Sequence, residues 1–133
     1  ISEVGQISPN HFHWSKMEDI INRGGGELCI QLWNATEDDA LDDTAVTVRI
    51  DGCETVLPAG GILRLKPGQS ITIPPRLYHM FWAEGEKCLA WEVSMVNDDN
   101  IDNRFYEEQL RFTRIEEDED PHHLLCNEYP VAK

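Results

Sequence analysis

A series of short apolar runs, separated by turn residues, constrains the fold of this chain more than any other feature. Ala45–Ile50 alternates apolar and polar residues and leads into Asp51-Gly52, a hairpin signal, after which Glu54–Leu57 is expected as the returning strand. Further strand-like runs are found at Glu27–Trp33, Ile62–Leu65, Ser70–Ile73, Leu77–Trp82 and Lys87–Met95. Strands this short and this closely spaced predict a β-sandwich, jelly roll or barrel.

The ends of the chain differ in character from this strand-rich middle. Lys16–Arg23 is compatible with a helical turn that ends at the glycine run Gly24–Gly26. Residues 97–133 are polar and acidic, with few strand-like runs. The 133 residues suffice for one compact domain with a core. We therefore expect a single domain over residues 1–133, in which residues 97–133 form loops and short elements wrapping the barrel.

Charge and cysteine content limit the partners and the compartment. The chain has 25 acidic and 11 basic residues, a formal net charge of −14, which argues against nucleic acid or an anionic membrane as a partner. No apolar run approaches the roughly 20 residues of a membrane-spanning helix. The 4 cysteines are scattered without a CxxC pair, which favours reduced thiols in a cytoplasmic protein over disulfides.

Histidines and a glutamate near the N-terminus form a metal-binding pattern. His11 and His13 are two residues apart, so in a strand both side chains point to the same face. Glu18 follows closely, and His79 lies in a later strand-like run. Three imidazoles and one carboxylate without thiolate suit an octahedral ion with two open positions, such as Mn²⁺, Fe²⁺, Co²⁺ or Ni²⁺. Structural zinc prefers a closed tetrahedral site, often with sulfur. Zn²⁺ is nevertheless compatible with the same nitrogen and oxygen donors.

The spacing of these residues resembles the two motifs of the cupins. The motifs read Gly5-x5-His11-x-His13-x4-Glu18-x6-Gly25 and Gly68-x5-Pro74-x-Arg76-x2-His79. The departures are Arg76 in place of the usual glycine and Ala83 in place of the usual asparagine, neither of which is a ligand position. The resemblance implies an all-β cupin fold, a jelly-roll β-barrel or sandwich with short peripheral helices or loops. It also implies that His11, His13, Glu18 and His79 are the metal ligands.

Longer runs resemble one family in particular, the cupin-type D-lyxose isomerases. These runs are His11–Trp14, Glu18–Gly26, Glu92–Phe105 and Ile115–Glu119, so the resemblance covers nearly the whole chain. It implies a manganese-dependent enzyme that interconverts D-lyxose and D-xylulose, and often D-mannose and D-fructose. The implied partner is a small sugar, and the implied assembly is a homodimer.

The resemblance also indicates what this sequence lacks. Family members usually carry a longer portion before the first motif, including a lysine that is thought to approach the substrate. Only 10 residues precede His11 here, and none of them is lysine. We therefore expect that a segment N-terminal to Ile1 is missing from this sequence.

An aldose–ketose shift through an enediol needs a base, and Glu92 is the best candidate for it. In Lys87–Met95, Glu92 alternates with bulky apolar residues and shares its face with the small residues Cys88, Ala90 and Ser94. This pattern favours a pocket face with room for a sugar. The resemblance further suggests that Asp99, Asp102 or Arg104 borders the sugar site. The ordinary alternatives are a solvent-facing Glu92 and an Asx-type turn around residues 97–103.

Three more residues are candidates for substrate binding. Lys16 lies between His13 and Glu18 and can reach a sugar hydroxyl, although a surface lysine is the simpler interpretation. Trp82 can stack on a sugar ring, although a core or interface role is its default. Glu116 can reach the pocket rim, although the acidic run around it is typical of a solvated surface.

Two other functions share the same ligand set. One is a cupin dioxygenase that binds Fe with three histidines and one glutamate. The other is a non-catalytic cupin that binds a sugar or a metal as a sensor. Glu92 and the polar run over residues 97–104 favour the isomerase, because a dioxygenase has less need of extra acid–base groups.

Overall fold

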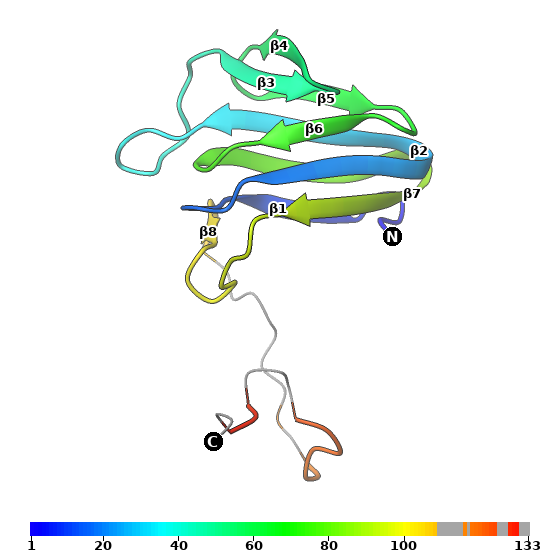
Figure 1. Cartoon of the computed structure of the whole chain (residues 1–133), viewed down its shortest axis with the longest axis vertical. Helices are drawn as coiled ribbons and strands as arrows, with labels where there is room; N and C mark the ends of the chain where they lie inside the picture. The colour runs from blue at the N-terminus through cyan, green and yellow to red at the C-terminus, as the bar shows by residue number, and fades with distance from the viewer. Residues whose placement is uncertain (109–115, 117, 125–127, 131–133) are drawn as a thin grey trace.

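The structure, a computed structural model, describes residues 1–108, 116, 118–124 and 128–130. The described residues form 8 strands and no helix: β1 (Ile7–Phe12), β2 (Glu18–Asn34), β3 (Val46–Ile50), β4 (Cys53–Leu57), β5 (Gly61–Leu65), β6 (Ser70–Ile73), β7 (Leu77–Ser94) and β8 (Arg104–Phe105). Their order is β4-β3-β6-β2-β7-β1-β8, and β5 pairs with β2. All paired strands are antiparallel (Figure 1). The predicted all-β, cupin-like fold is confirmed.

Two long strands, β2 and β7, organise the sheet. The first part of β2, Glu18–Ile21, lies between β6 and the end of β7. Its later part, Leu28–Leu32, lies between β5 and the start of β7. The expected helical turn over Lys16–Arg23 is wrong, since β2 begins at Glu18. The runs Leu77–Trp82 and Lys87–Met95, expected as separate strands, form the single strand β7, which ends at Ser94.

Glycines allow β2 to continue where the sequence pattern suggested an end. The pairing of β2 with β7 shifts register between Asn22 and Gly24 and again between Gly25 and Glu27. A Cβ atom on Gly25 would lie 1.9 Å from the carbonyl oxygen of Lys87, and one on Gly26 would lie 2.2 Å from that of Glu84. The glycine run therefore permits a close approach of two backbones within a continuous bulged strand.

The apolar core and the polar site occupy different parts of the sheet interior. The core consists of alternate, buried side chains, among them Ile20, Leu28, Ile30, Leu32, Val46, Val48, Leu65, Ile71 and Ile73. On the last part of β7, Cys88 is buried, whereas the alternate residues Leu89, Trp91 and Val93 are 41–59% exposed. The predicted division of Lys87–Met95 into two faces is therefore present, and the bulky residues form its outer face.

Among the described residues after β7, those that return to the sheet lie in the first part of the segment. Strand β8 pairs with β1, and Asp102 just before it is buried. The described residues beyond Glu108 are exposed and lie in no strand. Wrapping of the barrel by the remainder of residues 97–133 therefore stays a prediction.

Two further expectations concern disulfides and membranes. Cys29, Cys53 and Cys88 are free thiols, as expected, and Cys126 lies outside the described residues. Among the described residues, no helix has the length and apolar character needed to span a membrane.

Replacing Gly25 by alanine should destabilise the fold more than replacing Gly52, although both have positive φ angles, +92° and +82°. An alanine in the left-handed region costs about 1–2 kcal/mol. Only Gly25 adds a backbone clash, which costs roughly another 1–3 kcal/mol. Urea denaturation should therefore show a loss of about 3 kcal/mol for Gly25→Ala and about 1 kcal/mol for Gly52→Ala. Equal losses would contradict the close approach of β2 and β7.

Candidate metal centre

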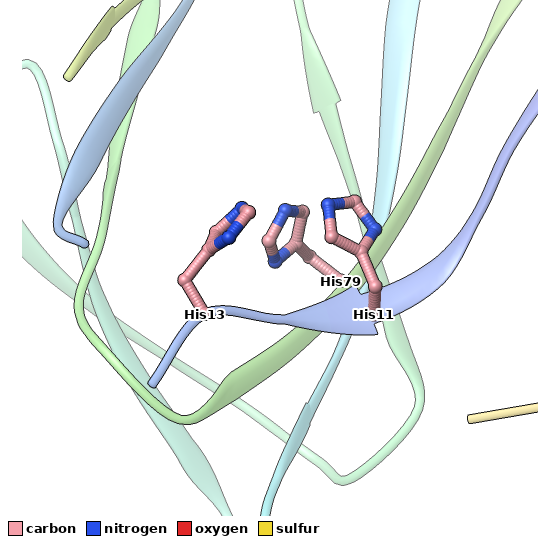
Figure 2. A group of neighbouring side chains, drawn as sticks. All are labelled: His11, His13 and His79. Atoms are coloured by element: carbon pink, nitrogen blue, oxygen red, sulfur yellow. The ribbon is translucent and has the colours of Figure 1, made fainter. Parts of the chain in front are cut away.

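Pairing of β1 with β7 brings three histidines together. His11 on β1 lies opposite His79 on β7, and His13 follows the last residue of β1. Their ligand nitrogens all lie within 4.8 Å of one another. Figure 2 shows the three rings grouped on one side of β1. His13 and His79 are 4% and 1% exposed, so the cluster faces the interior.

Hydrogen bonds to the main chain orient each imidazole. Each Nδ1 lies close to a carbonyl oxygen: Pro9 for His11 at 2.7 Å, Asp102 for His13 at 2.7 Å, and Leu77 for His79 at 3.0 Å. A carbonyl can only accept, so Nδ1 carries the proton when the ring is neutral. The lone pair is then on Nε2.

A buried carboxylate completes the cluster. Oε1 of Glu18 lies 3.0 Å from Nε2 of His79 and 3.6 Å from Nε2 of His13. None of these three buried atoms has a hydrogen-bond partner. Neutral imidazole nitrogens and a carboxylate oxygen are all acceptors, and buried acceptors require a partner. A cation among them satisfies all three, so the residues present fit a divalent metal ion.

The charge states of His11 and Glu18 suit such an ion. Burial, helped by nearby His79, lowers the pKa of His11 to about 3, so this imidazole is neutral near pH 7. Burial acts to raise the pKa of Glu18, but the surrounding polar groups, among them the Lys16 ammonium, lower it below its ordinary value overall. Metal ligands must be deprotonated, and both groups meet that requirement without a change in protonation.

A lysine connects the cluster to the candidate base. Nζ of Lys16 lies 2.8 Å from Oε2 of Glu18 and 2.6 Å from Oε1 of Glu92. Lys16 is only 6% exposed, so the simpler interpretation of a surface lysine is wrong. Burial acts to lower the pKa of Lys16, but its hydrogen bonds to Glu18 and Glu92 raise it overall. Lys16 is therefore a buried ammonium between two carboxylates, one of which, Glu92, is half exposed.

The cluster opens into a cavity of about 420 Å³. In addition to the three histidines and Glu18, its lining comprises Ser8, Pro9, Lys16, Phe81, Glu92, Asn97, Asp99, Asn103 and Phe105. The cavity combines the cluster, the Lys16–Glu92 pair and several neutral hydrogen-bonding groups. This combination suits a small polyhydroxylated ligand held beside a metal ion.

The structure places some predicted site residues in this cavity and others outside it. Glu92, Lys16 and Asp99 line it. Arg104 does not, because its neighbours Asn103 and Phe105 face the cavity and its guanidinium donates to the carbonyl of Phe105.

Two predicted substrate-binding residues also lie elsewhere. The indole nitrogen of Trp82 donates to Oε1 of Glu84 at 2.9 Å, and the side chain does not line the cavity. Trp82 is out of phase with His79 and Phe81, which share the inner face of β7. Glu116 is exposed and lines no part of the cavity.

The sequence interpretation missed several lining residues, among them Ser8, Phe81 and Phe105. Phe81 lies two residues after His79, so strand alternation alone would have identified it. Phe105 reaches the site because it pairs with His11 across β8 and β1. This pairing joins distant segments, and no local pattern signals it.

Comparison with known proteins relates the chain to a family of sugar isomerases. A family model described as D-lyxose isomerase matches residues 1–129. A D-lyxose/D-mannose isomerase of Serratia proteamaculans is 55% identical over 127 residues, which are 93% of this chain and 55% of the relative. A D-lyxose/D-mannose isomerase of Escherichia coli O157:H7 is 53% identical over 126 residues, which are 93% of this chain and 56% of the relative.

Each match covers a larger share of this chain than of the relative. The chain spans about half the length of the curated relatives it matches, whereas nearly all of the chain is aligned. The family model likewise covers the segments that contain the three clustered histidines and the segment that forms the cavity wall. On these grounds the chain belongs to the D-lyxose isomerase family.

Proposed function

We propose that this chain carries the catalytic centre of a metal-dependent aldose–ketose isomerase. The proposed reaction interconverts D-lyxose and D-xylulose, and also D-mannose and D-fructose. One observation carries the proposal: unpaired imidazole and carboxylate acceptors share a cavity with an ion-paired carboxylate, Glu92. The relatives named D-lyxose/D-mannose isomerase support the choice of sugars.

In this proposal His11, His13, Glu18 and His79 hold the ion, and Mn²⁺ is the proposed metal. The nitrogen and oxygen donors also suit Co²⁺, Fe²⁺, Ni²⁺ and Zn²⁺. A bound divalent ion polarises a sugar carbonyl and stabilises negative charge on the neighbouring oxygen.

Glu92 is the proposed base. Its carboxylate takes the proton from C2 of the aldose and returns it to C1, while the proton of the O2 hydroxyl passes to O1, which gives the ketose through an enediol. Lys16 binds Oε1 of Glu92 at 2.6 Å, and this charge-assisted contact fixes the position of the carboxylate. The half-exposed Glu92 side chain gives the base access to a substrate in the cavity.

The wall formed by residues 97–103 is proposed to bind sugar hydroxyls. Asn97, Asp99 and Asn103 line the cavity beside the cluster. Asn97 donates to the Asp99 carboxylate at 3.0 Å, so this wall is itself hydrogen-bonded. Amide and carboxylate groups held in this way can select the hydroxyl pattern of the substrate.

We further propose a cytoplasmic homodimer. The free thiols of Cys29, Cys53 and Cys88 suit a reducing compartment. The exposed apolar side chains Leu89, Trp91 and Val93 on the outer face of β7 supply a surface for association.

The direct test is ketose formation in deuterated water. The protein, reconstituted with Mn²⁺, is incubated with D-lyxose or D-mannose and followed by NMR. We expect ketose carrying deuterium at C1, because a base-bound proton exchanges with solvent before its return. Absence of ketose would contradict the proposal, and oxygen uptake with Fe²⁺ would indicate the dioxygenase.

His79→Ala should abolish metal binding and turnover together. Loss of a ligand should weaken Mn²⁺ binding by more than about 100-fold, since changes to residues that merely support ligands cost roughly 10- to 100-fold. Isothermal titration with Mn²⁺ measures this change. His122→Ala, at an exposed histidine outside the cavity, is the control and should bind normally. Unchanged affinity in His79→Ala would disprove the ligand assignment.

Glu92→Gln should separate metal binding from catalysis. The amide keeps the size of the side chain but cannot accept the C2 proton, so kcat should fall by about 10²- to 10⁴-fold. Mn²⁺ affinity should remain within a few-fold of wild type. The matched control is Glu86→Gln, at an exposed glutamate on the same strand. A near-normal kcat in Glu92→Gln would show that the base is a different residue.

A further inference from the structure

Asp102 is a buried carboxylate that neither lines the cavity nor belongs to the ligand cluster. It is 4% exposed and lies between β7 and β8. Its amide donates to the carbonyl of Asp98 at 2.9 Å, which closes a turn within its own segment. A buried charge needs strong partners, so the groups around Asp102 indicate its role.

The partners of the Asp102 carboxylate all lie on the loop between β1 and β2. Oδ1 accepts from the amide of Ser15 at 2.9 Å and from its hydroxyl at 3.1 Å. Oδ2 accepts from the amide of Lys16 at 3.1 Å. Charged acceptors make the stronger kind of hydrogen bond, so this carboxylate fixes the backbone immediately before Glu18.

The main chain of Asp102 contacts the same loop. Its carbonyl oxygen accepts from Nδ1 of His13 at 2.7 Å. This bond fixes the ring orientation and leaves Nε2 of His13 facing the cluster. One residue thus contacts both a metal ligand and Lys16, the lysine that binds Glu92.

The same contacts hold a wall of the cavity in place. Asn97, Asp99 and Asn103 line the cavity and belong to the segment that Asp102 anchors. The β1–β2 loop has two other main-chain restraints: the amide of Arg76 donates to His13 at 2.8 Å, and that of Met95 donates to Met17 at 3.0 Å. Neither of these restraints acts at Ser15 or Lys16.

We propose that Asp102 is a positioning residue that locks the loop His13–Lys16 to the segment 97–103. Through this lock it directs Nε2 of His13 to the metal centre and holds Nζ of Lys16 between Glu18 and Glu92. The inference rests on the proposed metal-dependent function. Asp102 acts only through these neighbours and does not contact the substrate.

Asp102→Asn is the principal test. The variant removes the negative charge and places an NH₂ group against a main-chain N–H of Ser15 or Lys16, which is a donor–donor contact. Mn²⁺ binding should weaken by roughly 10- to 100-fold, as for other residues that support metal ligands. Hydrogen exchange at the amides of Ser15 and Lys16 should accelerate, and kcat should fall more than KM rises.

Two further variants keep the test decisive. Ser15→Ala removes one hydroxyl bond and leaves the carboxylate and both main-chain bonds, so it should fold and weaken Mn²⁺ binding by roughly 2- to 5-fold. Asp120→Asn, at an exposed aspartate away from the cavity, should match wild type in every measurement. The lock is supported if Mn²⁺ affinity is highest in wild type, lower in Ser15→Ala and lowest in Asp102→Asn.

Specific outcomes would overturn the inference. A folded Asp102→Asn variant with wild-type Mn²⁺ affinity and unchanged exchange at Ser15 and Lys16 would reduce Asp102 to a structural residue. If Asp102→Asn does not fold, an unchanged Mn²⁺ affinity in Ser15→Ala has the same meaning. If wild type itself binds no Mn²⁺, the proposed function fails. The exchange rates and the His13 Nδ1–H signal of the metal-free protein then still decide whether the lock exists.

Discussion

The central constraint in this structure is the meeting of three buried acceptors, Nε2 of His13, Nε2 of His79 and Oε1 of Glu18, without a hydrogen-bond donor among them. Burying such groups unpaired costs free energy, and a cation placed among them removes that cost. The surrounding hydrogen bonds are arranged accordingly. Carbonyl oxygens hold the opposite imidazole nitrogens, and Lys16 binds the second oxygen of Glu18.

The sheet keeps the apolar core apart from this polar cluster. Strands β2 and β7 are long enough to contribute both to the apolar core and to the site. Leu28, Ile30 and Leu32 on β2 are in the core, while Glu18 at its start is in the cluster. The glycine run makes this length possible, because the two backbones approach too closely for side chains at Gly25 and Gly26. A rigid sheet on one side and hydrogen-bonded loops on the other then define the cavity.

Much of the site could be predicted from the sequence, because strand periodicity is a local property. The two-residue spacing of His11 and His13, and the alternation around Glu92, predict which side chains share a face. The rest depends on pairing between distant segments. In the sequence Lys16 resembles an ordinary surface lysine, and only the pairing of β2 with β7 brings Glu18 and Glu92 to it. Arg104 and Trp82 lie outside the cavity because strand phase places them on the opposite faces from Phe105 and Phe81. The glycine run wrongly suggested an end to the local element. Its backbone contacts with β7, which explain the glycines, cannot be seen in the sequence.

The most direct test of the metal centre is anomalous diffraction at the manganese edge from crystals of the Mn²⁺-loaded protein. The account predicts one strong anomalous peak enclosed by His11, His13, His79 and Glu18, with Lys16 still bound to Glu92. A peak elsewhere, or no peak in this cluster at saturating Mn²⁺, would contradict the account.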